Sequence, residues 1–253
     1  METKLKGIWR DHYYINSYDV DTKLNLKLSS LNNFMQDIAW KHAEHLKFGW
    51  NDLDEKGSAW VLTRLKIIFK QYPQWGEEII LETWPLSTEH YIYHRDFRLS
   101  NKNDQICVLA TSSWIIIDRN TRRPAIYKNT TDYEKIIPNI HAIEKKAEKI
   151  PLLNQSEREY IAIVGYSCLD MNQHANNAQY IDWIMDAFPL EMHQKYNITE
   201  FQINYLSEIL YGEELAILKE SIDTSQRTYR IEGFNLNQQK ASFRALVKWE
   251  AIS

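Results

Sequence analysis

The 253-residue sequence has few of the residues that build disulfide-rich or disordered proteins: it contains two cysteines, seven glycines and six prolines. Two cysteines, Cys107 and Cys168, are too few for a disulfide scaffold or a metal cluster, which indicates a reducing compartment. Little glycine and proline in a chain that is 44% hydrophobic and 25% charged predicts a globular protein with little disorder. The length allows one large domain or two small ones.

Long apolar runs and long basic runs are also missing. No stretch approaches the length of a membrane span and the first residues show no apolar run before a cleavage site, so we expect a cytoplasmic protein. Without a basic stripe or a base-stacking motif, nucleic acid is not an expected partner. The net charge of −4 is uneven: residues 1–150 hold 22 Lys and Arg against 20 Asp and Glu, whereas residues 151–253 hold 8 against 14. An acidic partner would therefore meet the first part of the chain.

The hydrophobic pattern twice predicts a helix followed by strands. An apolar stripe at three- and four-residue spacing predicts a helix that begins at Ser29 or Ser30 and ends near Gly49, after an extended arm at 10–28. The first set of strands is expected at 59–70, 78–86, 90–99 and 106–117. An extended segment at 161–169 precedes a second helix at about 176–188. The second set of strands is expected at about 200–207, 213–223, 227–236 and 240–250.

The two parts of the chain also share sequence marks, such as YPQWGEE at 72–78 and EILYGEE at 208–214. We therefore predict an α+β protein made of two copies of one helix-plus-sheet unit, at 1–127 and 161–253. The polar, Lys-rich residues 128–160 are expected to form a linker. The two sheets are either joined edge to edge or packed as a pair.

A candidate site precedes the second helix, where Asp170, Asn172 and His174 occupy alternate positions. Alternate residues of an extended segment point to one side, and the helix start offers unpaired N–H groups to the same place. One interpretation is a hydrolytic site; the other is a loop in which Asp and Asn cap a helix. The corresponding first part (SYDVDTKLNLKLSS) lacks the set, which predicts one site per chain.

The Asp-x-Asn-x-His-x-Asn-Asn motif resembles that of the hotdog thioesterases, and its tandem setting resembles the acyl-ACP thioesterase family of plants and bacteria. Other similar stretches are WVLTR at 60–64, YPQWGEE at 72–78, Arg95-Asp96 and SSWIIIDRNTRRP at 112–124. The resemblance covers almost the whole chain. It implies a double hotdog fold, each half a long helix wrapped by an antiparallel sheet. It also implies hydrolysis of fatty acyl-acyl carrier protein, which ends fatty acid synthesis. Plant members carry a transit peptide that is not apparent here, so the chain resembles bacterial members.

Asp170, Asn172 and His174 match the family motif directly, and the resemblance adds Glu208 after Tyr205. Ile209 stands where plant members have Cys, so a Cys nucleophile at that position is excluded. A carboxylate mechanism follows, in which Glu208 or Asp170 deprotonates the attacking water and His174 polarises the water or protonates the leaving thiolate. Asn172 would position a carboxylate or the substrate carbonyl. Backbone N–H groups near the helix start would receive the oxyanion.

A fatty acyl chain needs a dry apolar pocket, and the expected wall is the first helix with Met35, Ile38 and Trp40. Acyl carrier protein is acidic, and Arg119, Arg122 and Arg123 offer a docking surface of the opposite charge. No metal site and no cofactor motif is expected. The alternatives are an acyl-CoA thioesterase, a non-catalytic acyl-binding hotdog protein and a hotdog dehydratase. A homodimer is compatible with the sequence.

Overall fold

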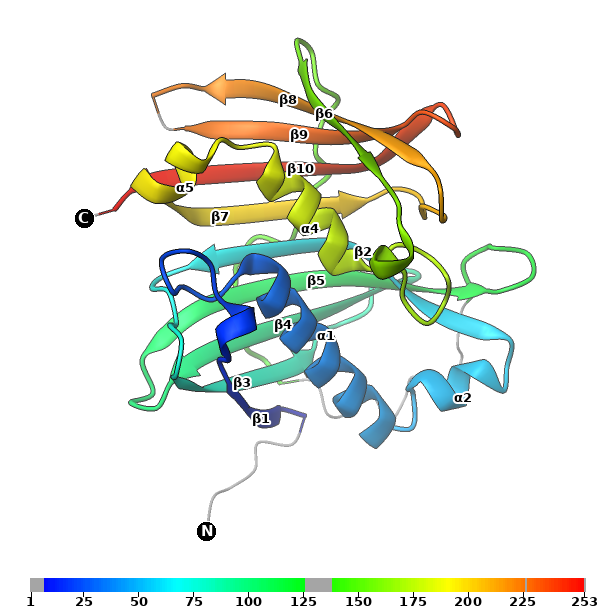
Figure 1. The fold of residues 1–253 in the computed structure, drawn as a ribbon. Coiled ribbons are helices and arrows are strands. Elements are labelled where there is room, and N and C mark those ends of the chain that lie inside the picture. Colours follow the sequence, from blue (N-terminus) through cyan, green and yellow to red (C-terminus); the bar gives the residue numbers. More distant parts are fainter. Residues whose placement is uncertain (1–6, 126–137, 226, 253) are drawn as a thin grey trace.

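The computed structural model describes residues 7–125, 138–225 and 227–252. Ten strands form one antiparallel sheet in the order β1-β3-β4-β5-β2-β7-β10-β9-β8-β6. Two helices, α1 (Leu28–His45) and α4 (Asn177–Asp186), lie on the same face of this sheet and pack against each other (Figure 1). The predicted α+β double hotdog is confirmed, and its two sheets are joined edge to edge.

The first half wraps five strands around α1, and the second half wraps five around α4 (Figure 1). The first five strands are β1 (Trp9–Tyr14), β2 (Ser58–Phe69), β3 (Glu78–Pro85), β4 (Ile92–Asn101) and β5 (Ile106–Asp118). The second five are β6 (Glu157–Ile163), β7 (Tyr196–Tyr205), β8 (Glu214–Asp223), β9 (Thr228–Asn235) and β10 (Lys240–Ala251). The halves meet where β2 pairs with β7, from Arg64 opposite Asn204 to Ile68 opposite Glu200. Because the two strands share backbone hydrogen bonds, one hydrophobic core runs through both halves.

Three local predictions were wrong. Helix α1 begins at Leu28 with Lys27 as its N-cap, and Gly49 instead caps a short helix, α2 (Trp50–Asp54), which the sequence pattern did not reveal. The arm at 10–28 is extended only through β1, after which the chain turns through a 3₁₀ helix, η1 (Ser17–Asp19). A further short helix, α5 (Leu190–Lys195), follows α4.

The alternation predicted for the strand at 59–70 is also broken. β2 has a bulge at Thr63, where Leu62 pairs with Trp114 but Arg64 pairs with the next residue, Ser113. A bulge adds one residue and reverses which side chains face inward beyond it. Leu62, rather than Val61, therefore shares the buried face with Leu65.

The described part of the predicted linker crosses the sheet face that the helices leave open. Asn204 on β7 accepts from the Ile150 N–H through its side chain at 2.7 Å, and Glu220 on β8 accepts from the Asn154 N–H at 3.1 Å. On β4, the Asp96 carboxylate accepts from the Ala142 N–H at 2.7 Å, whereas the neighbouring Arg95 points to the helix side. These contacts hold residues 138–156 against the sheet; residues 128–137 lie outside the described part of the chain.

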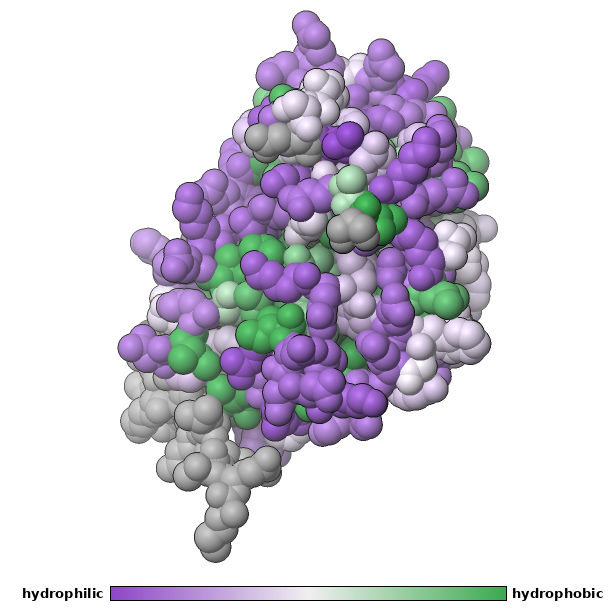
Figure 2. Space-filling view, turned by 90° about the vertical axis from the view of Figure 1, so that its left-hand side faces the viewer, coloured by the Kyte–Doolittle hydropathy of each residue, from purple (hydrophilic) through white to green (hydrophobic). Residues whose placement is uncertain are grey.

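The surface in Figure 2 is mostly hydrophilic, with hydrophobic residues gathered in a patch. Among the described helices, none combines the length and the apolar character needed to cross a bilayer.

Gly233 on β9 allows a close contact in the core of the second half. A Cβ at this position would lie 2.0 Å from Cε1 of Phe243, a fully buried side chain on β10 that packs against Tyr180 of α4. Gly233→Ala should therefore lower the free energy of unfolding by about 1–3 kcal/mol, because the buried ring has to shift. Urea unfolding measures this. The control Gly165→Ala, whose Cβ would meet nothing within 4 Å, should change it by less than about 0.5 kcal/mol; equal effects would contradict the packing argument.

Candidate active site

The loop that carries the predicted site is a tight turn rather than an extended segment. It follows the 3₁₀ helix η2 (Tyr166–Cys168) and closes where the Asp170 N–H donates to the His174 carbonyl at 2.8 Å. The Asp170 carboxylate faces its own loop: Oδ1 accepts from the Asn172 N–H at 2.8 Å and from the His174 N–H at 3.4 Å. Gln173 has a φ of 64°, which lets the chain reverse. Asp170, Asn172 and His174 therefore do not converge by alternation, and Asn172 is exposed.

A second turn brings Glu208 to this loop. His174 forms a β-bridge with Leu210, and the Ala175 N–H donates to the Ile209 carbonyl at 2.9 Å. These backbone contacts hold the loop beside the end of β7. As a result His174 Nε2 lies 3.4 Å from Oε2 of Glu208, with both side chains partly exposed. An imidazole and a carboxylate in contact at the surface can move a proton between water and a bound substrate.

Arg122, from the first half of the protein, also reaches Glu208. It lies in the turn after β5, has a φ of 59°, and pairs with the same Oε2 that faces His174. Since both partners contact Oε2, Oε1 is the oxygen that can accept from a water molecule. Sequence reasoning placed Arg122 on a docking surface and did not connect it with Glu208, because no local pattern joins the two halves.

The other two predicted docking residues lie on the same turn. Arg119 pairs with Asp54, the last residue of α2, at 2.5 Å. Arg123 is exposed, and its backbone carbonyl accepts from the Asp118 N–H at 3.0 Å. The turn therefore presents Arg123 at the surface, while Arg119 and Arg122 reach carboxylates of the protein itself.

The start of α4 lies directly after His174. The Asn176 side chain accepts from the Ala178 N–H at 2.9 Å and caps the helix. Two tyrosines support this region: the hydroxyl of the partly buried Tyr205 donates to the Asn177 carbonyl at 3.2 Å, and that of the buried Tyr180 donates to the Ser207 carbonyl at 3.4 Å. Burial raises the pKa of both hydroxyls, and the nearby carboxylates of Glu208 and Asp170 add to the effect at Tyr180. The tyrosines therefore stay protonated and act as fixed donors.

The first half contains the same loop without the two reactive side chains. The Asp21 N–H donates to the Asn25 carbonyl at 2.8 Å, and Asp21 Oδ1 accepts from the Lys23 N–H at 2.8 Å. Leu24 repeats the left-handed φ of 64°, and Asn25 bridges to Gln74 as His174 bridges to Leu210. Asn25 therefore stands in the place of His174.

The residue equivalent to Glu208 is Tyr72, which precedes Pro73 as Glu208 precedes Ile209. Its hydroxyl donates to the Ile198 carbonyl at 2.9 Å, and burial raises its pKa. Each half thus has an equivalent aspartate, Asp21 or Asp170, whose carboxylate accepts hydrogen bonds within its own turn. The pairing of His174 with Glu208 distinguishes the second half.

The role of Asp170 in the turn leads to a prediction. Asp170→Asn keeps Oδ1 as the acceptor and should keep kcat within about fivefold of wild type, whereas Asp170→Ala should lower it by about 10- to 100-fold and cost about 1–2 kcal/mol of stability. The matched control is Asp21→Ala, which removes the same turn from the first half. It should cost similar stability and leave kcat unchanged. A thousandfold loss of kcat in Asp170→Asn, measured by steady-state kinetics, would assign the proton transfer to Asp170 instead of Glu208.

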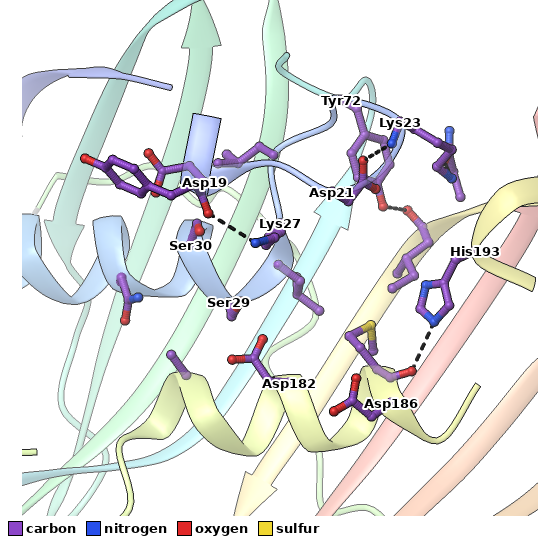
Figure 3. Close-up of a pocket in the computed structure, with 18 of the residues that line it drawn as sticks. Asp19, Asp21, Lys23, Lys27, Ser29, Ser30, Tyr72, Asp182, Asp186 and His193 are labelled. Carbon is purple, nitrogen blue, oxygen red and sulfur yellow. Dashed lines mark hydrogen bonds between the residues drawn. The ribbon is translucent and has the colours of Figure 1, made fainter. Parts of the chain in front are cut away.

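A cavity of about 720 Å³ opens at the first-half loop, between the start of α1 and the end of α4 (Figure 3). Its lining includes Lys23, Tyr72, Asp182 and His193, but neither His174 nor Glu208. Lys23 crosses it, donating to the Tyr196 carbonyl at 2.8 Å. The cavity thus lies at the loop that carries Asn25 and Tyr72 in place of the reactive pair.

The residues predicted to line an acyl pocket occupy two different environments. Met35 and Ile38 are buried in the core between α1 and the sheet. Trp40 is 52% exposed and lies on the outer side of α1. Among the described residues, no group of three or more His, Cys, Asp or Glu side chains is placed to hold a metal ion.

Two family models match the chain. Residues 6–133 match the acyl-ACP thioesterase N-terminal domain, and residues 152–251 match the C-terminal domain. A chloroplastic palmitoyl-acyl carrier protein thioesterase of Gossypium hirsutum is 26% identical over 214 residues, 79% of this chain and 52% of the relative. A chloroplastic dodecanoyl-[acyl-carrier-protein] hydrolase of Cinnamomum camphora is also 26% identical, over 79% of this chain and 56% of the relative. The chain thus spans about half the length of these curated relatives.

Two solved structures are similar over nearly the whole chain. An acyl-ACP thioesterase from Bacteroides thetaiotaomicron has a TM-score of 0.88 and 28% identity, covering 96% of this chain and 98% of its own. A 12:0-ACP thioesterase from Umbellularia californica has a TM-score of 0.86 and 22% identity, covering 97% and 98%, and supports the fold. The two family models, which together match most of the chain, show that it belongs to the acyl-ACP thioesterase family.

Proposed function

We propose that this protein hydrolyses the thioester of fatty acyl-acyl carrier protein and releases a free fatty acid, which ends chain elongation. The observation that carries the proposal is the contact between His174 and Glu208 beside the start of α4. The equivalent loop of the first half carries Asn25 and Tyr72, so the pair is not a requirement of the fold. The names of the relatives supply the substrate class.

The chemistry proceeds by direct attack of water. Glu208 Oε1 takes a proton from a water molecule, whose oxygen attacks the thioester carbon. The carbonyl oxygen becomes an oxyanion that the Asn177 N–H at the start of α4 stabilises, since the Ala178 and Gln179 N–H groups donate to Asn176. The tetrahedral intermediate then breaks its carbon–sulfur bond, and the leaving thiolate takes up the proton held by Glu208. The carboxylate is thereby regenerated for the next turnover.

His174 and Arg122 direct this carboxylate. His174 Nε2 lies 3.4 Å from Oε2 of Glu208, and Arg122 pairs with the same atom. The Arg122 ion pair and the His174 contact at one oxygen fix the plane of the carboxylate and leave Oε1 turned to the water. On this proposal Asn172, which is exposed on the loop, contacts the substrate rather than a neighbouring carboxylate.

The acyl chain enters the core of the first half beside Met35 and Ile38, which are apolar and shielded from water. Trp40 is too exposed to line that space and is left out of the proposed pocket.

The carrier protein docks at the mouth of the site. Tyr166, Met171 and Tyr211 expose 86%, 74% and 67% of their surfaces there, which suits a protein partner. Arg123 supplies positive charge from the turn after β5, with Arg119 and Arg122 beside it. The free thiols of Cys107 and Cys168 suit a reducing, cytoplasmic setting.

The test is thiol release from acyl carrier proteins bearing chains of different length, measured beside the matching acyl-CoAs. We expect faster release from the carrier protein, with a maximum at one range of chain lengths. Equal or faster release from acyl-CoA would reassign the substrate to acyl-CoA. Binding of acyl chains without release would show a non-catalytic acyl-binding protein.

A further inference from the structure

The first residue of the catalytic-half helix is held by the other half of the protein. Asn177 begins α4, and its Nδ2 donates to Oε1 of Gln36 on α1 at 3.1 Å. The two helices pack against each other on the same face of the sheet, so this hydrogen bond crosses the boundary between the halves. Asn177 lies three residues after His174, at the N-terminal end of α4. This end of the helix is proposed to receive the oxyanion.

Asn177 is restrained on its backbone as well. The hydroxyl of Tyr205, at the end of β7, donates to the Asn177 carbonyl at 3.2 Å. Gln36 therefore fixes the side chain and Tyr205 fixes the main chain of the same residue. Two restraints from different elements leave the first turn of α4 one orientation relative to His174.

The internal duplication shows what the fold does without this hydrogen bond. Leu28 begins α1 as Asn177 begins α4, and Met185 occupies on α4 the place that Gln36 occupies on α1. Both Leu28 and Met185 line the cavity of the first half, beside the loop with Asn25. The helix pair can therefore pack with apolar residues at these positions. The hydrogen-bonded pair of Gln36 and Asn177 occurs at the end of the helix pair near His174 and Glu208.

We infer that Gln36 is a positioning residue for hydrolysis: it holds Asn177, and with it the Asn177 N–H at the start of α4, at the thioester carbonyl. This inference rests on the proposed function. Gln36 does not contact the reacting atoms. Its effect appears in the transition state, where charge develops on the carbonyl oxygen, so its loss lowers kcat more than it raises KM.

The test compares three variants on the best acyl carrier protein substrate. Gln36→Met copies the equivalent residue of α4, Met185, and removes the acceptor, and should lower kcat about 10- to 100-fold with KM within about threefold. Gln36→Glu keeps an acceptor for Asn177 and should retain kcat within about threefold. Met185→Leu, at the equivalent position on the other side, should leave kcat unchanged. Thermal unfolding of each variant confirms folding, and Gln36→Ala replaces Gln36→Met if the latter does not fold.

A double-mutant cycle tests whether Gln36 acts through Asn177. Asn177→Ala alone should lower kcat as much as Gln36→Met, and the double variant should be no slower than Asn177→Ala alone. Wild-type kcat in Gln36→Met, or losses that multiply in the double variant, would overturn the inference. Absence of thiol release from the wild-type protein would instead overturn the proposed function.

Discussion

Glu208→Gln is expected to lower kcat for hydrolysis of acyl carrier protein thioesters by about 10³-fold, with KM changed by less than about threefold. Gln has the shape of Glu and its amide oxygen can still accept from Arg122, but it cannot take a proton from water. The substitution therefore removes the proton transfer while the surrounding contacts keep their geometry. Stopped-flow detection of the released thiol measures the effect.

The control for Glu208→Gln is Glu214→Gln, which makes the same charge change at the exposed start of β8. It should leave kcat within about twofold of wild type, because Glu214 belongs to neither turn of the site. If Glu208→Gln kept more than a tenth of wild-type kcat, Glu208 would not be the group that activates water.

The second large effect is expected for His174→Asn, which should lower kcat by about 10²- to 10³-fold. Asn is the residue that the first half carries at this position, in the same turn, as Asn25. The variant should therefore fold with nearly wild-type stability, so that the loss reports on chemistry rather than on structure. The imidazole that orients the Glu208 carboxylate is gone, and Oε1 no longer faces the water in one orientation.

Steady-state kinetics measures the loss of kcat, and thermal unfolding measures the stability of the variant. The control His141→Asn, at an exposed position, should change neither quantity. Activity above one tenth of wild type in His174→Asn, in a protein that unfolds at the wild-type temperature, would show that Glu208 acts without the imidazole.

Periodicity predicted the two helices and most strands, because an amphipathic helix shows an apolar stripe in its sequence and a half-buried strand shows alternation. It failed at Thr63, where a bulge reverses the alternation, and at Gly49, which begins α2 instead of ending α1. The bulge depends on pairing with β5, which a local pattern does not contain, whereas Gly49 caps α2 through its N–H to Asp52 Oδ2, in a helix too short to show a periodic stripe. The edge-to-edge joining of the sheets likewise depends on the pairing of β2 with β7.

The candidate site was also predicted only in part from the sequence. The motif located the loop with His174, but alternation did not predict its shape, since Asp170 Oδ1 closes a turn. Glu208 lies on a different element and entered only through the family resemblance. The contacts from Arg122 and Gln36 cross between the halves, where no sequence spacing connects them. The equivalence of Asp21 with Asp170 was visible in the sequence and would have revealed the structural role of this carboxylate.

Direct attack of water, activated by Glu208, is tested by one turnover in H₂¹⁸O with enzyme in excess over acyl carrier protein substrate. Mass spectrometry then reads the label in the released fatty acid and in the peptide that contains Glu208. Direct attack predicts one ¹⁸O in the fatty acid and no change in the mass of the peptide. An unlabelled fatty acid with ¹⁸O in Glu208 would mean that the carboxylate attacks the thioester itself, and would contradict the account.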